Sequence, residues 1–214
     1  MNDDAHSTRP SLLMRLRDAH DEAAWRQFVE IYTPLVYGFC RRRDLQEADA
    51  ADVAQEVMRA VARSMERFEY DPGRGRFRNW LLTVVRSKLN NFLAARQRQP
   101  DPASATRLQS LVEETQRGGS EQSEWDTEYH RQVFHWAAGR IRAEFQDSSW
   151  QAFWQTAVEQ RDGREVATNL GLSLGAVYVA KSRVLARLRQ EVHLVDPEEL
   201  PGAQGFSGTD GIQD

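Results

Sequence analysis

The sequence has a single cysteine, Cys40, among its 214 residues, which excludes an internal disulfide and a zinc site built from cysteine pairs. It also lacks the HExxH string of a zinc protease and the glycine and lysine string of a phosphate-binding loop. No apolar run approaches the roughly 18 residues of a membrane-spanning helix, and residues 1–10 are too polar for a signal peptide. We therefore expect no metal, no cofactor, no membrane insertion and a cytoplasmic location.

Strand-like alternation and internal repeats are lacking too, whereas apolar residues recur at spacings of three and four. This periodicity predicts a first helix around Trp25 to Phe39, which we expect Pro34 to kink or divide. Further helices are predicted over 48–68 and 79–97, separated by a loop at 70–75 that contains proline and glycine. The fold class is therefore all-α.

The periodicity stops after residue 98 and returns at Trp125. The intervening stretch is rich in proline, serine, threonine, glutamine and glycine, a composition typical of a linker. We expect two small helical domains: residues 12–98, a polar linker at 99–124, residues 125–191 and an acidic tail at 192–214. No nucleophile with a neighbouring base is evident, so the sequence predicts a binding protein rather than an enzyme.

The net charge of −4 conceals an uneven distribution along the chain. Residues 74–100 carry seven basic side chains and no acidic one, whereas residues 192–214 carry five acidic side chains and no basic one. A local basic run matters more to a phosphate backbone than the net charge does. The distribution therefore favours nucleic-acid contact by the first domain.

The most specific local motif lies near the C-terminus, where Ala167, Gly171 and Val177 have the spacing of a helix-turn-helix. The small residue lets two helices cross closely, glycine supplies the positive φ of the turn, and the β-branched residue packs the second helix on the first. Ser173 is placed to cap that second helix. An ordinary helical hairpin with a solvated basic face is the alternative. The outward residues that could reach a major groove are Tyr178, Lys181, Ser182, Arg183 and Arg187.

In the first domain, a polar stripe lies opposite the valines of the helix predicted at 48–68. Taken alone, such a stripe is more often the solvated side of an amphipathic helix. An aromatic and basic stretch follows it, which combines rings that stack bases with arginines that hold phosphates. For Phe77 and Trp80, core packing is the competing interpretation. The stripe consists of Asp49, Asp52, Gln55 and Glu56, and the stretch contains Arg76, Phe77 and Asn79.

These strings resemble the extracytoplasmic-function sigma factors of bacterial RNA polymerase. Residues 49–57 (DAADVAQEV) and 77–89 (FRNWLLTVVRSKL) look like region 2 of that family, and residues 173–188 (SLGAVYVAKSRVLARL) resemble region 4. The order of the two regions, the linker and the total size agree as well, so that the resemblance covers residues 12–191. The family's commoner region 4 wording, Thr-Val-Lys-Ser-Arg, is replaced here by Val-Tyr-Val-Ala-Lys-Ser-Arg.

The resemblance implies three binding surfaces. The stripe of Asp49, Asp52, Gln55 and Glu56 would dock on the clamp helices of core RNA polymerase. The helix after the loop would capture the melted proximal promoter element, and the second helix of the helix-turn-helix would read the distal element in duplex DNA. The residues assigned to the proximal element are Arg76, Phe77, Asn79, Arg86, Lys88, Arg96 and Arg98, and those assigned to the distal element are Tyr178, Lys181, Ser182, Arg183 and Arg187.

Two other functions are compatible with parts of the sequence. A stand-alone helix-turn-helix regulator would bind its site without polymerase, and a helical adaptor would bind only proteins. The sequence leaves open whether an anti-sigma factor, the acidic tail or simple abundance controls activity, and it does not reveal the promoter sequence.

Overall fold

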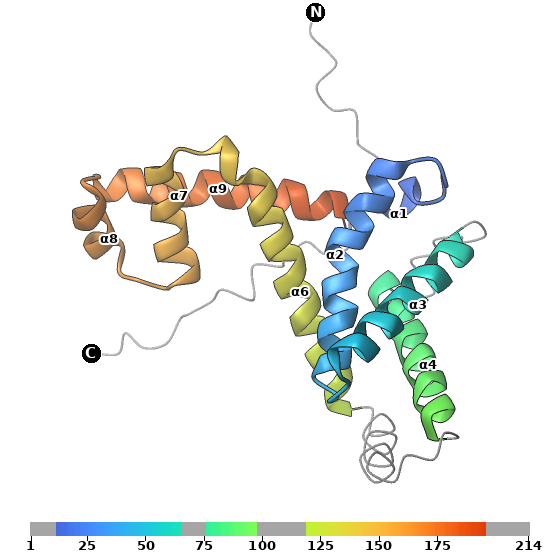
Figure 1. Cartoon of the computed structure of the whole chain (residues 1–214). Coiled ribbons are helices and arrows are strands. Elements are labelled where there is room, and N and C mark those ends of the chain that lie inside the picture. The colour runs from blue at the N-terminus through green and yellow to red at the C-terminus, as the bar shows by residue number, and fades with distance from the viewer. Residues whose placement is uncertain (1–11, 66–75, 98–118, 196–214) are drawn as a thin grey trace, which may run out of the picture. The chain divides into compact units, whose positions relative to one another are not determined.

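The computed structural model describes residues 12–65, 76–97 and 119–195, and within these ranges all regular structure is helical (Figure 1), which confirms the all-α prediction. The chain divides into two compact units, Leu12–Val133 and one that begins at Phe134. The helices of the first unit are α1 (Leu12–Arg15), α2 (Glu22–Arg41), α3 (Glu47–Met65), α4 (Phe77–Gln97) and the first part of α6 (Gly119–Ile141). The second unit contains the rest of α6, η2 (Arg142–Glu144), α7 (Asp147–Phe153), η3 (Trp154–Val158), α8 (Gly163–Leu170) and α9 (Leu174–Val195).

Local chemistry fixes the start of α2. Asp21 caps the helix, since its side chain accepts the Ala24 backbone N–H at 2.9 Å. Both carboxylate oxygens of Asp21 also accept from the Arg15 guanidinium at 2.9 Å, which ties α1 to α2. These bonds, first of all the one from Arg15, hold the pKa of Asp21 below its usual value.

Pro34 does not divide α2, which is continuous from Glu22 to Arg41. A proline inside a helix costs about 3 kcal/mol, because it removes a backbone donor and crowds the preceding turn. Buried apolar residues flank it on both sides, Tyr32 before it and Leu35 and Val36 after it. Each such burial contributes about 1.5–3 kcal/mol, so core packing outweighs the local preference.

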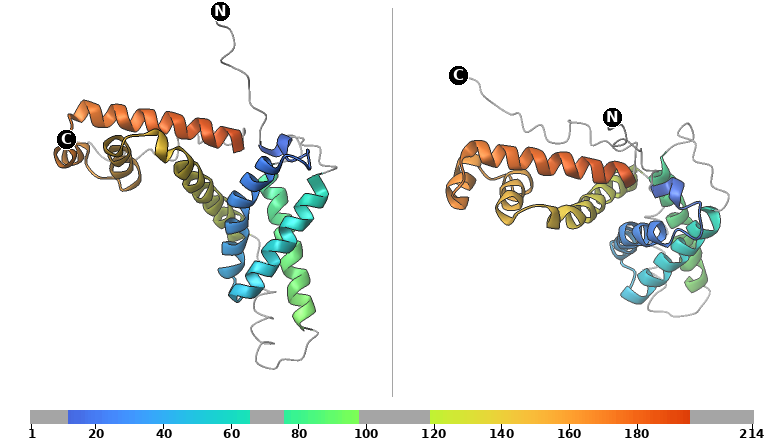
Figure 2. Two further views of the ribbon diagram at one scale, coloured as in Figure 1. Left: turned by 45° about the horizontal axis from the view of Figure 1, so that its top comes forward. Right: turned by 90° about the horizontal axis from the view of Figure 1, so that it is seen from above.

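Helix α3 packs against both α2 and α4, an arrangement that both views in Figure 2 display. Its buried positions include Val53, Val57, Val61 and Met65, the spacing that the sequence predicted. Helix α4 begins at Phe77, two residues before the predicted start, while the predicted loop at 70–75 lies outside the described residues.

Helix α6 begins at Gly119, whereas the sequence placed the start of the second domain at residue 125. Trp125, Tyr129 and Val133 are buried, and they belong to the compact unit Leu12–Val133. Trp125 meets Phe39 edge-on with ring centroids 5.2 Å apart, and the Tyr129 and Tyr32 hydroxyls lie 3.5 Å apart. The periodicity at these positions therefore reflects packing on α2 and not on the helices that follow.

The second unit surrounds α9 with the shorter helices. Ala137, Ala138 and Ile141 of α6 form one apolar cluster with Val184 and Leu188 of α9, which Trp150 and Phe153 complete. Between α7 and α8 the chain makes a π-helical turn at Trp154–Val158, in which the Glu159 N–H donates to the Trp154 carbonyl at 3.0 Å.

Candidate nucleic-acid and protein interfaces

Helices α8 and α9 form the predicted helix-turn-helix. Gly171 ends α8 with a φ of 64°, the left-handed conformation that glycine adopts without a Cβ penalty. The Leu172 N–H donates to the Ala167 carbonyl at 2.9 Å, and the Ala176 N–H donates to Ser173 Oγ at 3.1 Å. These hydrogen bonds confirm the predicted turn at Gly171 and the predicted cap by Ser173.

The interior of the motif also agrees with the sequence. Val177 is fully buried, and Ala167 is nearly so. Both lie in one apolar cluster with Val166, which Leu170 and Leu172 cover from the side. The β-branched and small residues therefore perform the packing roles that their spacing predicted.

The outward face of α9 presents most of the residues expected to meet duplex DNA. Tyr178, Ser182 and Arg183 are exposed, and Lys181 is half-buried. Val179 is an exposed apolar residue beside them, with 52% of its surface accessible. The sequence analysis did not single it out, because a valine inside a helix pattern suggests core rather than surface.

Arg187 has protein partners already. Its guanidinium donates to both oxygens of Glu144 at 2.8 Å, and to Glu191 at 3.0 Å. These bonds, first of all those to Glu144, raise the pKa of Arg187. Glu191 is buried and accepts a further bond from Arg140 at 2.7 Å. The network anchors α9 to η2 and α6, so Arg187 differs from its exposed neighbours on α9.

On α3 the acidic stripe separates into two parts. Asp52, Gln55 and Glu56 are exposed, and Arg59 donates to the last two at 3.3 and 2.5 Å. Asp49 is buried and pairs with Arg96 of α4. Asp49, which was expected to bind polymerase, and Arg96, which was expected to bind promoter phosphates, therefore neutralise each other's charge.

Phe77 is 4% exposed and lies in the core of the first unit. Its ring centroid is 6.1 Å from that of Phe28, 5.6 Å from that of Tyr32 and 5.3 Å from that of Trp80. In this conformation the ring therefore offers no face to a base, and the core interpretation describes its position. Trp80 is half-buried beside it.

Two further α4 residues contact α6. The Gln122 amide donates to Asn79 Oδ1 at 3.0 Å, and Arg86 Nε donates to Glu121 at 2.6 Å. Arg43 donates to the other oxygen of the same carboxylate at 2.5 Å. Burial lowers the pKa of Arg43, an effect that Glu121 opposes. The sequence analysis missed Glu121 because it lay in the predicted linker.

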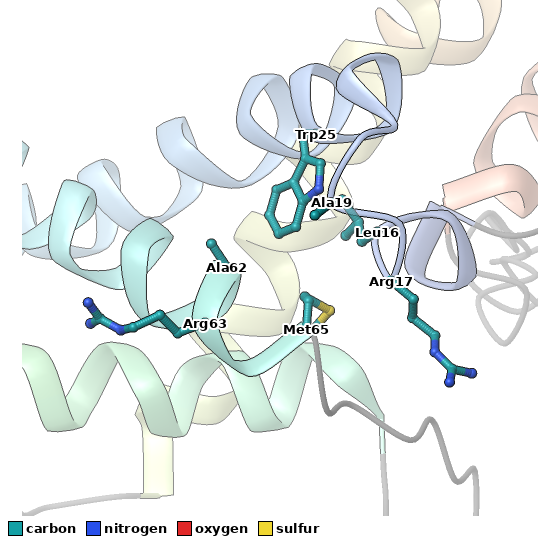
Figure 3. Close-up of a pocket in the computed structure, with 7 residues that line it drawn as sticks. All are labelled: Leu16, Arg17, Ala19, Trp25, Ala62, Arg63 and Met65. Carbon is teal, nitrogen blue, oxygen red and sulfur yellow. The ribbon is translucent and has the colours of Figure 1, made fainter.

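The remaining predicted strand-binding residues are distributed along α4. Arg76 is exposed and Lys88 is half-buried, while Arg98 lies outside the described residues. A pocket, shown in Figure 3, lies elsewhere, between the turn after α1 and helices α2 and α3. It contains none of the predicted site residues. Its lining comprises Leu16, Arg17, Ala19, Trp25, Ala62, Arg63 and Met65.

The described residues contain no helix that is long and apolar enough to cross a membrane. Groups of three or more potential metal ligands are also absent from this part of the chain.

Comparison with known proteins matches part of the first unit to a family. Residues 28–99 match the sigma-70 region 2 family, which places α2, α3 and α4 in that domain. Over 196 residues the chain is 29% identical to the ECF RNA polymerase sigma factor RpoE of Cereibacter sphaeroides, an alignment that covers 90% of this chain and 99% of that protein. The chain is therefore similar over most of its length to an extracytoplasmic-function sigma factor.

Proposed function

We propose that the chain is an alternative sigma factor that binds bacterial core RNA polymerase and directs promoter-specific transcription initiation. The observation that carries this proposal is the order of its parts. A sigma-70 region 2 domain at residues 28–99 is followed in the same chain by a helix-turn-helix whose turn and cap are complete. Its partners are core polymerase and duplex and melted promoter DNA, and the sequence leaves open whether an anti-sigma factor also binds it. The chain acts by binding, without catalysis, and works in the cytoplasm with the polymerase.

The exposed part of the α3 stripe would contact polymerase. Asp52 and Glu56 are accessible, lie on one helix face and carry negative charge, which suits a basic partner. Asp49 is held by Arg96 and would join them only after that ion pair opens.

The basic face of α4 would bind the melted proximal element, and α9 would bind the distal element. Residues 12–98 would then act as region 2, together with the part of α6 that packs on them, and residues 134–191 would act as region 4, with the acidic tail after them. At the N-terminal half of α9, Tyr178, Ser182 and Arg183 are exposed where a recognition helix contacts base edges. The acid-free run on α4 would contribute affinity that falls with salt.

The test is in vitro transcription from a genomic fragment library with purified core polymerase, with and without this protein. Transcript starts that depend on the protein and share two upstream elements would support the proposal. Footprints by the protein alone, without new starts, would indicate a stand-alone regulator instead.

Paired variants test the recognition helix in the same assay. Lys181→Ala with Arg183→Ala should abolish the new starts, because both side chains lie at the proposed groove-facing end of α9. Arg189→Ala, an exposed arginine further along the same helix, is the matched control and should leave transcription close to wild type. Unchanged transcription in the double variant would refute the assignment.

A further inference from the structure

The first part of α6 is acidic where it meets the first unit. Residues 121–128, the cover segment, carry four acidic side chains and no basic one. The segment contacts α4 and the end of α2, and α4 lies in the run at 74–100 that has no acidic residue. The surface and the segment on it therefore have opposite charge.

Glu121 is the centre of this contact. It is 5% exposed, and its two carboxylate oxygens accept from Arg43 at 2.5 Å and from Arg86 at 2.6 Å. Two guanidinium groups around two anionic oxygens is the arrangement with which arginines hold a phosphate. Arg86 is also one of the residues assigned to the promoter strand by the family resemblance.

The neighbouring contacts fall on the same stretch of α4. Gln122 donates to the Asn79 side chain at 3.0 Å and so occupies the amide oxygen that would accept from a base. The Trp125 indole N–H donates to the Arg78 carbonyl at 3.1 Å, and Asp126 lies 2.8 Å from the Arg78 guanidinium. Successive turns of the cover segment thus engage residues 78, 79 and 86.

The contact between the cover segment and α4 is polar although its central residues are buried. Glu121 is 5% exposed and Arg78 6%, and burial of a charge costs free energy that its ion-pair partner only partly restores. A contact of this kind gives specificity more than stability, and another anion of the right geometry can replace its acidic partner.

On the basis of the proposed function, we infer that the cover segment occupies a strand-binding site formed by Arg43, Arg78, Arg86 and Asn79, and that single-stranded promoter DNA takes this site when the segment leaves it. The carboxylates of the segment stand where strand phosphates bind. Arg43 and Arg78 are then strand-binding residues that the family resemblance did not supply. The free chain is therefore held in a state of low affinity for the melted strand.

The experiment compares full-length variants for binding to a fluorescein-labelled single-stranded oligonucleotide, measured by fluorescence anisotropy. Glu121→Gln removes the charge that competes with phosphate but keeps the size and one acceptor oxygen. Because bonds to charged groups are the strong ones, we expect binding about tenfold tighter than wild type.

Glu22→Gln is the matched control. It makes the same change of charge in the same unit but outside the cover segment, and Glu22 is exposed. Its affinity should stay within about twofold of wild type, since surface charges contribute little. A general effect of net charge would move both variants equally and would overturn the inference.

A second variant guards against loss of folding in Glu121→Gln. Trp125→Phe removes the bond to the Arg78 carbonyl but keeps an aromatic ring against Phe39, and it should tighten strand binding about two- to threefold. Circular dichroism checks that each variant is helical.

Amide hydrogen exchange gives a readout that a purely structural helix would not change. Addition of the oligonucleotide should accelerate exchange in residues 121–128 of the wild-type chain. Equal or weaker binding by folded Glu121→Gln and Trp125→Phe, or continued protection of the segment with strand bound, would overturn the inference. Either result could occur in a chain that still supports polymerase-dependent transcription, so the proposed function is tested separately.

Discussion

Replacement of Gly171 by alanine should destabilise the helix-turn-helix through the backbone alone. A Cβ built at this position meets nothing within 4 Å, so no steric clash contributes. The φ of 64° is the cause, because an L-residue in the left-handed region costs about 1–2 kcal/mol. The smaller entropy of the unfolded alanine chain returns about 0.4–1 kcal/mol, which leaves a net loss near 1 kcal/mol.

Gly139 provides the opposite case within the same unit. A Cβ there also meets nothing within 4 Å, but Gly139 lies inside α6 and does not have a positive φ. Gly139→Ala should therefore stabilise the unit by about 0.5–1 kcal/mol. The two substitutions add the same methyl group into open space and differ only in backbone conformation.

The assay is thermal unfolding by circular dichroism, with amide exchange used to assign the transition to the second unit. For a domain of about 60–100 residues, 1 kcal/mol corresponds to a shift of about 4–8 °C in Tm. We expect Tm to fall for Gly171→Ala, to fall less for Gly171→Asn, and to rise for Gly139→Ala. Equal shifts of one sign for both alanine variants would refute the reasoning, as would a Gly171→Ala variant as stable as wild type.

Four further predictions concern the first unit. Burial raises the pKa of the Cys40 thiol to about 12, so a thiol reagent at about pH 8 should modify the urea-unfolded chain much faster than the native chain. Stability should also fall as the pH rises above 9.0, because the unfolded thiol then ionises while the buried thiol stays protonated; a flat urea-unfolding profile there would contradict this. Phe77→Ala should lower the free energy of unfolding by about 3–5 kcal/mol, and a variant of wild-type stability would show that the ring is not core. Asp52→Arg with Glu56→Arg should abolish polymerase capture while the helical circular dichroism signal persists, whereas reversal of exposed Glu159 should not; polymerase bound normally by the double variant would refute the docking surface.

The helix-turn-helix could be predicted from the sequence because its determinants are local. The φ of Gly171 and the cap by Ser173 depend on residues within a few positions, and Val177 packs with Val166 and Ala167 from the preceding helix of the same motif. Local chemistry of this kind leaves a readable spacing, and the spacing was sufficient for the turn, the cap and the interior.

Helix α6 could be predicted as a helix, but its packing partner could not. Trp125 and Tyr129 have helical spacing, which is the same whichever core they enter. Contacts with residues far away in sequence decide the matter: Glu121 meets Arg43 across 78 positions, and Tyr129 meets Tyr32 across 97. Periodicity carries no information about such pairings.

Tertiary packing likewise decides whether Pro34 interrupts α2. The local rule predicts a break or kink, whereas the buried residues on either side keep α2 continuous. The sequence did not identify Glu121 as a site residue, because an acidic residue in a polar stretch is typical of a linker. Only the structure shows that Arg43 and Arg86 pair with it.

If Asp49 binds polymerase and Arg96 binds the promoter strand, as proposed, their ion pair would make the two binding events thermodynamically dependent on each other. A basic group of polymerase that took Asp49 would release Arg96 for a phosphate, and a phosphate that took Arg96 would release Asp49 for polymerase. By linkage, each partner would strengthen the other's binding by the same factor. The free energy of opening the pair would be spent when either partner bound alone but only once when both bound, so this one bridge between α3 and α4 would make the loading of promoter and polymerase cooperative.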